Sequence, residues 1–579
     1  MKKLMLGNDA VARGLYEGGL SFASSYPGTP STEITEALAK YDDVYSEWAS
    51  NEKVAAEAAF GASVAGARSF CAMKHVGLNV AADLLYTASY TGVNGGFVIA
   101  VADDPGMHSS QNEQDSRHHA IASKAMMIEP SDSAECLEFA KKALALSERF
   151  DTPIILRLST RVSHSQSIVT VSERDVVPMK KYEKNIGKYV MMPGNAIKRH
   201  VAVEERLETI KSWAESCELN KTEINGSKTG IITSGISYQY AKEALGDGAD
   251  YLKLGVINPL PENIIKEFCA SHETVWVLEE LDDIIETHCK KLGLEVKGKQ
   301  FFSLRGEYTA TEIKRVIKGE TVETVTAPES APVRPPVMCP GCPHRGVFYV
   351  LSKLKLYVSG DIGCYTLGAA APLSAIDTTI CMGASVSMLH GFNVANKNAG
   401  VAAKSVAVIG DSTFIHSGIT GLIDIAYNRS NSTVIILDNS ITGMTGHQQN
   451  PTTGKTIKGD PTAAVSLEAL VKAIGIELVS IVDPFDVKTL EAKVKEYTSL
   501  DAPSVIICRR PCALLKYVKP SAPVTINSEK CVNCGMCLKA GCPAIVKKDG
   551  KMQINPVLCT GCGLCEKICA VGAIVKEAK

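Results

Sequence analysis

The sequence has no excess of charge of either sign, because 61 lysines and arginines stand against 63 aspartates and glutamates and leave a formal net charge of −2. Proteins that bind nucleic acid through its phosphates usually carry a clear basic excess, so the composition argues against that class. No apolar run approaches the roughly 18 residues of a membrane helix. The apolar start at 1–7 is too short for a signal peptide and is followed at once by Asn8 and Asp9. We therefore expect a cytoplasmic protein without nucleic-acid or membrane partners.

The cysteine content is the unusual feature of the composition. Hydrophobic residues make up 45% of the chain and charged residues 21%, which is ordinary for a globular protein and excludes the disordered and collagen-like classes. Of the 19 cysteines, 14 lie after residue 338. Disulfides are expected in small secreted domains, whereas clustered cysteines in a large chain without an export signal more often hold metal. The cysteines therefore predict metal sites in the second half of the chain.

Strand-like and helix-like segments alternate in the first part of the chain and again after residue 228. This alternation predicts α/β domains built on parallel sheets. A polar, irregular stretch separates the two regions, and four prolines within ten residues mark an extended linker. Beyond the linker, two β-branched runs flank a predicted helix, which is typical of a βαβ crossover. The expected organisation is a domain at 1–172, a connecting segment at 173–228, a domain at 229–326, the linker at 327–336, and domains at 337–519 and 524–579.

The tail contains two cysteine runs, and three positions of the first run recur 28 residues later, so it is a duplicated unit. It resembles the bacterial two-cluster ferredoxins, in which thiolates hold [4Fe–4S] clusters and the last cysteine of each run binds the other cluster. The first run departs by one extra residue before its last cysteine, and Ala570 stands where a proline is usual. Zinc on Cys₄ sites is the alternative, but it does not explain tandem triplets. The resemblance implies one cluster on Cys531, Cys534, Cys537 and Cys569, and another on Cys559, Cys562, Cys565 and Cys542.

Polar side chains follow two predicted strands of the 337–519 domain. Asp411 comes after the strand at 405–409, and Asn439 comes after the strand at 433–437. An acidic residue at a strand end, followed by a helix N-terminus, suits a hydrated Mg²⁺ that grips a diphosphate. A plain βαβ unit with an aspartate helix cap is the alternative interpretation.

The order of these motifs resembles the diphosphate-binding domain of thiamine diphosphate enzymes, in which Gly-Asp-Gly is followed by an asparagine. Ser412 departs from that pattern, because it replaces the last glycine. The resemblance implies a Mg²⁺ bound by Asp411, Asn439 and the backbone carbonyl of Ile441, with Gly383, Gly410 and Ser412 also in the cofactor site.

Four further cysteines surround these motifs: Cys339 and Cys342 in Cys-Pro-Gly-Cys-Pro-His-Arg, Cys364 after Gly-Asp-Ile-Gly, and Cys512 after Arg-Arg-Pro. They resemble the ligands of the cluster nearest thiamine in the 2-oxoacid:ferredoxin oxidoreductases, and the resemblance implies a third [4Fe–4S] cluster. Two alternatives stay open. Cys508 is a rival for Cys512, and a buried apolar role is the alternative for Cys364.

A Tyr-Pro-Gly-Thr-Pro-Ser loop at 26–31 follows a predicted strand, and Glu52 opens a predicted helix. In isolation, a turn and a favourable acidic first turn explain both features. Together they resemble the pyrimidine-binding domain of the same oxidoreductases, where such a loop borders the substrate and a glutamate contacts the thiamine aminopyrimidine. The resemblance assigns these roles to Thr29 and Glu52, with Glu57 and Glu47 as alternatives for the glutamate.

The stretch at 103–117 is too polar for a core strand and is expected to line the active-site cleft. Lys74, His75 and Arg117 are candidate anchors for the carboxylate of a substrate, and a surface or helix-cap role is the alternative for each.

Nearly the whole chain resembles the 2-oxoacid:ferredoxin oxidoreductases, and among them the large α subunits of the indolepyruvate branch. The resemblance implies an α/β fold of the thiamine diphosphate-binding type, with two doubly wound parallel-sheet domains and a C-terminal two-cluster ferredoxin domain. The pyrimidine-binding domain falls at 1–172, a transketolase-C-like domain at 229–326, the diphosphate-binding domain at 337–519 and the ferredoxin domain at 524–579.

The activity that the resemblance implies is oxidative decarboxylation of arylpyruvates such as indolepyruvate to acyl-CoA and CO₂, with coenzyme A and ferredoxin as partners. Single-chain pyruvate oxidoreductases carry an additional domain that has no counterpart here, so a small β subunit is expected in a heterodimer or α₂β₂ assembly. The alternatives are an oxidoreductase for another 2-oxoacid, a non-oxidative thiamine-dependent decarboxylase, and an electron-transfer subunit with a vestigial thiamine fold. The presence of Glu52, Asp411 and Asn439 argues against the last.

Overall fold

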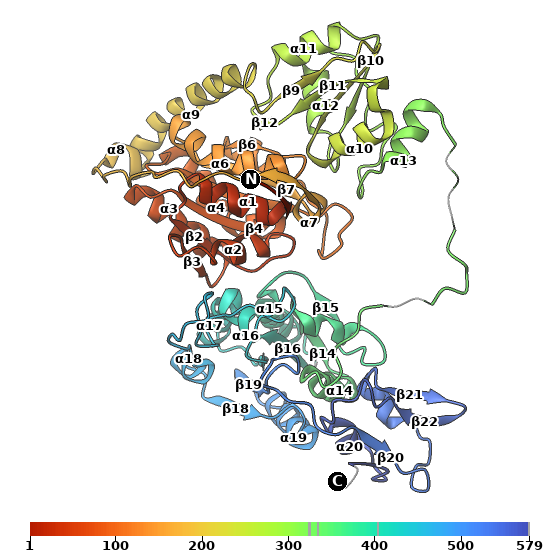
Figure 1. Cartoon of the computed structure of the whole chain (residues 1–579). Coiled ribbons are helices and arrows are strands. Elements are labelled where there is room, and N and C mark those ends of the chain that lie inside the picture. Colours follow the sequence, from red (N-terminus) through yellow and green to blue (C-terminus); the bar gives the residue numbers. More distant parts are fainter. Residues whose placement is uncertain (322, 324–325, 333–334, 402–403, 577–579) are drawn as a thin grey trace. The chain divides into compact units, whose positions relative to one another are not determined.

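The computed structural model describes residues 1–321, 323, 326–332, 335–401 and 404–576, which belong to two compact units, Met1–Thr326 and Ala327–Lys579 (Figure 1). Within the described residues, no helix combines the length and the apolar character needed to cross a bilayer.

The first unit is built on a seven-stranded sheet in which every pairing except that of β12 is parallel. In spatial order its strands are β12 (Val256–Asn258), β6 (Met126–Ile128), β7 (Ile154–Ser159), β5 (Phe97–Asp103), β4 (Ser69–Lys74), β2 (Phe22–Ser25) and β3 (Tyr45–Trp48). A separate antiparallel pair joins β1 (Lys2–Leu6) to β8 (Gln166–Thr170).

Both faces of this sheet are buried, as expected for strands with continuous apolar runs. Alternate residues of a strand point to opposite faces, so Ala72 and Ala100 belong to one core cluster while Cys71 and Ile99 belong to another. The first cluster includes residues of α1 and α6, and the second includes residues of α3 and α4. The helices up to residue 214 are α1 (Gly7–Glu17), α2 (Thr32–Leu38), α3 (Glu52–Ala65), α4 (His75–Thr91), α5 (Arg117–Ser123), α6 (Ser133–Phe150), α7 (Thr160–His164), α8 (Ile186–Tyr189) and α9 (Pro193–Ala214).

A second, four-stranded sheet completes the first unit. Its spatial order is β13 (Thr274–Leu278), β10 (Thr229–Ser234), β11 (Asp250–Leu254) and β9 (Lys221–Glu223), and only β9 is antiparallel. Ile232 and Val277 of this sheet lie in the same core cluster as Ile99 of the first sheet and Leu78 of α4. The regions expected as the 1–172 and 229–326 domains therefore share one core, and β12 also joins the larger sheet. The helices here are α10 (Gly235–Leu245), α11 (Asn263–Ala270), α12 (Ile284–Lys291) and α13 (Ala310–Ile313).

The expectation of irregular structure between residues 173 and 228 is wrong over α9, which has 22 residues. Among its apolar residues only Val203, Ile210 and Ala214 are fully buried. Such a narrow apolar stripe leaves most of the helix surface polar. The 3.6-residue repeat of apolar residues that predicts a helix is therefore weak in this segment.

The second unit is built on a six-stranded sheet in which every pairing is parallel. In spatial order its strands are β15 (Thr378–Thr379), β14 (Tyr357–Gly360), β16 (Ser405–Gly410), β17 (Thr433–Asp438), β19 (Ser504–Arg509) and β18 (Leu478–Val482). Alternate residues again divide between two core clusters, with Val406 in one and Ala407 in the other. The helices are α14 (His344–Leu354), α15 (Ala384–Asn398), α16 (Asp411–Thr413), α17 (Ile419–Tyr427), α18 (Leu467–Ala473), α19 (Val487–Tyr497) and α20 (Leu564–Ile568).

The cysteine-rich tail contains two small antiparallel pairs and packs onto this sheet. One pair joins β20 (Val524–Ile526) to β23 (Ile574–Lys576), and the other joins β21 (Ile545–Lys548) to β22 (Lys551–Ile554). Ala540, Leu564 and Ile568 of the tail belong to the same core cluster as Cys342 and Val406. The tail therefore folds against the domain that precedes it.

Candidate active site and cysteine groups

The predicted site residues of the first unit gather at one edge of its large sheet. Because β2, β4 and β5 are parallel, their carboxyl ends meet at the same edge, where ligands bind in open α/β sheets. Thr29 lies in the loop after β2, Lys74 ends β4, and His75 begins α4. A Cβ atom placed on Gly28 would lie 3.4 Å from the Cβ atom of Lys74, so the Thr29 loop runs beside the start of α4.

Glu52 is buried at the start of α3, with 5% of its surface exposed. The side chain of Asn51 caps this helix by accepting a hydrogen bond from the Val54 amide at 2.8 Å. A Cβ atom on Gly77 would lie 2.8 Å from Oε1 of Glu52, so a glycine in the first turn of α4 makes room for this carboxylate. Of the alternatives, Glu57 is exposed near Lys53, and Glu47 accepts a hydrogen bond from Ser24 at 2.9 Å.

Lys74 is a buried cation at this edge. Its Nζ atom donates to the backbone oxygen of Ser109 at 2.6 Å and to the hydroxyl of the same residue at 3.2 Å. Burial lowers the pKa of Lys74 to about 8, although the nearby Asp104 carboxylate acts in the opposite direction. His75 is 1% exposed, and burial lowers its pKa as well. The stretch after β5, predicted to line the cleft, thus contacts Lys74.

Arg117 does not have the surroundings expected of a substrate anchor, because its guanidinium lies inside a buried ion network. Nε donates to both carboxylate oxygens of Asp115, at 2.9 and 3.0 Å, and Nη1 donates to Glu279 at 2.5 Å. Nη2 donates to Asp115 and to the backbone oxygens of Glu280 and Asp282. Every guanidinium nitrogen is already engaged and the residue is 1% exposed, so this structure assigns Arg117 to holding the network together.

The second unit brings Asp411 to the carboxyl edge of its sheet, where it begins α16. Oδ1 accepts a hydrogen bond from the Ser412 amide at 2.8 Å, whereas Oδ2 is buried and has no hydrogen-bond partner among the described residues. Burial, reinforced by the neighbouring Asp438 carboxylate, raises the pKa of Asp411 to about 8. A buried carboxylate with an open oxygen fits a hard cation such as Mg²⁺.

Asn439 lies at the end of the adjacent strand, and the register places Gly410 opposite Leu437. The Nδ2 atom of Asn439 donates to Nε2 of His344 at 3.4 Å, and its Oδ1 atom accepts from the Ile441 amide at 3.3 Å. Burial lowers the pKa of His344 to about 4, so its ring is neutral and Nε2 can accept. His344 therefore supports the amide predicted to bind Mg²⁺, a role that sequence reasoning missed although the residue belongs to a motif already noted.

Gly383 and Gly410 both lie where a side chain would not fit. Gly383 has a φ of 84° and its amide donates to Asp361 at 2.9 Å, while the Ser385 amide donates to the other oxygen of Asp361 at 3.0 Å. Asp361 thus caps α15, which is a further role that the sequence did not reveal. A Cβ atom on Gly410 would lie 2.7 Å from the ring of Tyr365. Ser412 accepts a hydrogen bond from the Thr442 hydroxyl at 3.0 Å.

The four cysteines around these motifs lie near enough to influence one another, and we call them the proximal group (Cys339, Cys342, Cys364 and Cys512). Burial raises the pKa of Cys342 to about 12 and that of Cys364 to about 11, and neighbouring thiols of the group add to both shifts. The Cys512 amide donates to the backbone oxygen of Asn439 at 2.9 Å, so the group adjoins the predicted Mg²⁺ site. Its rival Cys508 is buried in the sheet within β19.

The eight tail cysteines line two small hollows. Cys531, Cys534, Cys537 and Cys569 line one, and Cys542, Cys559, Cys562 and Cys565 line the other. Each hollow therefore combines three cysteines of one run with the last cysteine of the other run, as the ferredoxin resemblance implies. Pro340 and Gly341, from the loop between Cys339 and Cys342, line the second hollow as well, so this one adjoins the proximal group.

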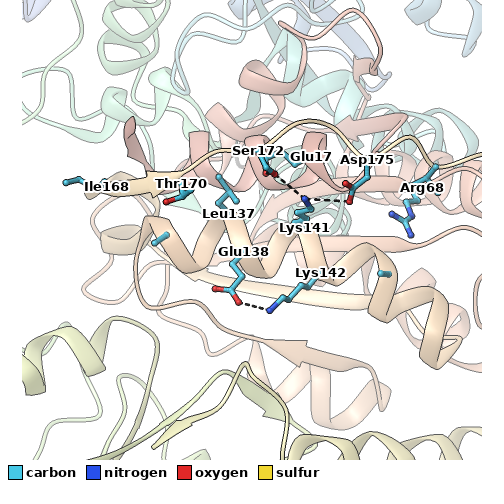
Figure 2. A pocket seen from close by; sticks show the side chains of 13 residues that line it. Glu17, Arg68, Leu137, Glu138, Lys141, Lys142, Ile168, Thr170, Ser172 and Asp175 are labelled. Atoms are coloured by element: carbon cyan, nitrogen blue, oxygen red, sulfur yellow. Dashed lines mark hydrogen bonds and ion pairs between the residues drawn. The ribbon is translucent and has the colours of Figure 1, made fainter. Parts of the chain in front are cut away.

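A larger hollow of about 670 Å³ in the first unit is formed by α6, β8 and the segment that follows β8 (Figure 2). Its charges neutralise one another, because Lys141 pairs with Asp175 at 3.6 Å and Lys142 pairs with Glu138 at 2.6 Å. None of the predicted site residues lines it. The carboxyl edge of each large sheet is therefore a candidate functional site of its own unit.

Three segments of the chain match known protein families. Residues 13–215 match the thiamine diphosphate-binding family of pyruvate flavodoxin/ferredoxin oxidoreductases, residues 361–508 match the C-terminal TPP binding domain of thiamine pyrophosphate enzymes, and residues 551–574 match a 4Fe-4S binding domain. The chain is 40% identical to the indolepyruvate oxidoreductase subunit IorA of Archaeoglobus fulgidus, over 94% of this chain and 93% of that protein. The chain belongs to the indolepyruvate oxidoreductase IorA family.

The IorA subunit of Methanothermobacter marburgensis is also 40% identical, over 99% of this chain and 97% of that protein. A solved 2-oxoglutarate:ferredoxin oxidoreductase from Magnetococcus marinus, with 2-oxoglutarate, coenzyme A and succinyl-CoA bound, is 20% identical with a TM-score of 0.48, over 55% of this chain and 65% of that chain. Membership of the IorA family confirms the resemblance drawn from the sequence. The expected fold class is confirmed too, as is the enzyme class, a thiamine diphosphate-dependent 2-oxoacid:ferredoxin oxidoreductase.

Proposed function

We propose that this chain is the catalytic large subunit for ferredoxin-dependent oxidative decarboxylation of indolepyruvate and other arylpyruvates to acyl-CoA and CO₂. The IorA relatives support the substrate class by name. The observation that carries the proposal is the position of the proximal group beside the predicted Mg²⁺ site, since the Cys512 amide donates directly to Asn439. A redox centre next to a thiamine site serves an oxidative reaction, whereas a non-oxidative decarboxylase has no use for it.

The residues present fit thiamine diphosphate and Mg²⁺. The open carboxylate oxygen of Asp411, the side chain of Asn439 and the carbonyl of Ile441 would hold the metal. When bound, the cofactor supplies the nucleophilic carbon and the electron sink for decarboxylation.

The first unit contributes a carboxyl group, that of Glu52, and a cation, Lys74. Glu52 would hydrogen-bond the aminopyrimidine ring, and its burial beside Gly77 keeps that carboxylate in one position and away from water. Lys74 and His75 would face the substrate carboxylate, with Thr29 on the neighbouring loop. Lys74 suits this role because an anionic substrate offsets the cost of burying its charge.

Three [4Fe–4S] clusters are part of the proposal, one on the proximal group and one in each tail hollow. The fit rests on the chemistry of the donors, since each place collects four cysteine side chains. Clusters take electrons singly, so a series of them would pass the two electrons of the oxidation to ferredoxin. Coenzyme A would accept the acyl group, and a small β subunit would complete the enzyme.

The test is 2-oxoacid-dependent reduction of ferredoxin or a viologen dye by the anaerobically purified chain, with and without its β subunit. We expect indolepyruvate and phenylpyruvate to give higher kcat/KM than pyruvate and 2-oxoglutarate. Release of CO₂ without dye reduction would point to a non-oxidative decarboxylase, and cluster reduction without any 2-oxoacid turnover would point to an electron-transfer subunit.

Iron analysis tests the cluster count separately. We expect about 12 irons per chain, from three clusters of four irons. A value near 8 would remove the proximal cluster from the proposal.

A further inference from the structure

Arg345 joins the two cysteine groups that lie next to each other in the second unit. It sits in the first turn of α14 and is 2% exposed. Nε donates to the backbone oxygen of Cys339 at 3.0 Å, and Nη2 donates to that of Met338. Nη1 donates to the backbone oxygens of Ala540, at 3.3 Å, and Gly541. One guanidinium therefore holds the loop before Cys342 and the loop before Cys542 together.

The charge of Arg345 has no ordinary counter-ion. Its hydrogen-bond acceptors are neutral backbone carbonyls, and no carboxylate in the described part of the chain forms an ion pair with it. Burial lowers the pKa of the guanidinium, and the thiols of Cys542, Cys342 and Cys339 oppose that shift most strongly. A buried charge is costly unless it is paired, and these sulfur atoms would supply the opposite charge once they are deprotonated to bind metal.

The tight fit around Arg345 shows that its position is specific. Gly541 has a φ of 63°, and a Cβ atom there would lie 3.2 Å from Nη1 of Arg345. By contrast, the group formed by Cys531, Cys534, Cys537 and Cys569 receives no contact from this side chain in the described residues. Arg345 therefore lies beside the proximal group and the group that contains Cys542, and within the described part of the chain it does not contact the third.

We propose that Arg345 is a positioning residue and an electrostatic counter-ion shared by the proximal group and the Cys542 group. This inference rests on the proposed function, because it requires both groups to hold iron–sulfur clusters. Thiolate-bound clusters are negatively charged, and reduction adds a further negative charge, so a fixed cation favours the reduced form. Arg345 therefore raises the reduction potentials of these two clusters and fixes their separation.

The test compares Arg345→Gln, which removes the charge, with Arg345→Lys, which keeps it. Both are made in the full chain with its β subunit, and Lys353→Met on the exposed face of α14 is the control. Potentials are measured by redox titration followed by electron paramagnetic resonance at known iron content. We expect Arg345→Gln to shift two of the three midpoint potentials to more negative values and to leave the third unchanged. Arg345→Lys should restore most of the shift.

Three unchanged potentials in Arg345→Gln at full iron content would overturn the inference. If Arg345→Gln loses iron, selective loss of about eight irons that Arg345→Lys partly restores supports the positioning role, by the four-iron count. Loss of all iron in both variants would show a general folding role and overturn it. A wild-type chain without reducible clusters would instead defeat the proposed function.

Discussion

The two large sheets both end in an edge crowded with charged side chains, but they balance these charges differently. In the first unit, Arg117 pairs with Asp115 and Glu279, and Arg157 pairs with Asp103 at 2.8 Å. In the second unit, Asp411 has an open buried oxygen and Arg345 is surrounded by carbonyls and thiols.

In the first unit the buried charges are balanced by other side chains. In the second unit, we expect bound ions to balance them. Where buried charges neutralise one another, the chain can fold without a cofactor. We expect such an edge to bind the thiamine ring and the substrate. Where a buried carboxyl group and a buried guanidinium each lack an oppositely charged partner among the described residues, a bound ion can supply the compensating charge. We expect Mg²⁺ to balance Asp411 and iron–sulfur clusters to balance Arg345.

The comparison fails if Asp411 is not a metal ligand. We expect Asp411→Asn to weaken Mg²⁺-dependent thiamine diphosphate binding by more than about 100-fold, because a direct ligand matters more than the outer partners whose loss costs about 10–100-fold. The metal-free variant should be about as stable as the wild type, since the raised pKa keeps the Asp411 carboxyl largely protonated near neutral pH and asparagine is a neutral group of the same shape. Calorimetric titration and thermal unfolding measure the two effects, with the exposed Asp501→Asn as control. Wild-type binding by Asp411→Asn would refute the assignment.

A substitution of Glu52 tests whether the carboxyl edge of the large sheet in the first unit activates the thiamine ring of the cofactor. We expect Glu52→Gln to lower kcat by about 100- to 10,000-fold, the usual range for a lost acid–base group, while thiamine diphosphate binding persists. Steady-state dye reduction and calorimetric titration distinguish these outcomes. The control is Glu57→Gln, an exposed position on the same helix. Full activity in Glu52→Gln would contradict its role in cofactor activation.

Substitutions of Arg117 and Lys74 should have different effects, because we expect Arg117 to stabilise the fold and Lys74 to bind the substrate. Arg117→Met should lower the free energy of unfolding by about 3–5 kcal/mol, because it leaves buried carboxylates unpaired. Lys74→Met should instead raise KM for the 2-oxoacid and leave stability nearly unchanged. Chemical denaturation and steady-state kinetics on the same preparations measure both. A raised KM at unchanged stability in Arg117→Met would return this residue to the substrate site.

His344 gives the smallest expected effect, because it acts through Asn439. We expect His344→Phe to weaken Mg²⁺-dependent cofactor binding by about 10- to 100-fold, as for other partners that orient a metal ligand. His344→Gln keeps an acceptor and should recover part of the affinity. Calorimetry with varied Mg²⁺ measures this, and equal affinities in His344→Phe and the wild type would remove His344 from the metal site.

Much of the fold could be predicted, and candidate metal ligands could be chosen, because the signals are local. The strands that lead to Asp411 and Asn439 are short β-branched runs, and each structural strand begins or ends near its predicted bound. The tail cysteines were recognisable by their spacing. The long helix α9 escaped prediction, because only a narrow stripe of it is buried.

The sequence by itself determined most of the strands and helices and the pattern of the cysteine runs, because hydrophobic period and cysteine spacing are properties of neighbouring residues. Only the tertiary structure decided which charges are already neutralised. Arg117 meets Glu279 across 162 positions of sequence, and Arg345 meets Gly541 across 196. Such partners come together only when the chain folds, and burial then determines what each unpaired charge requires.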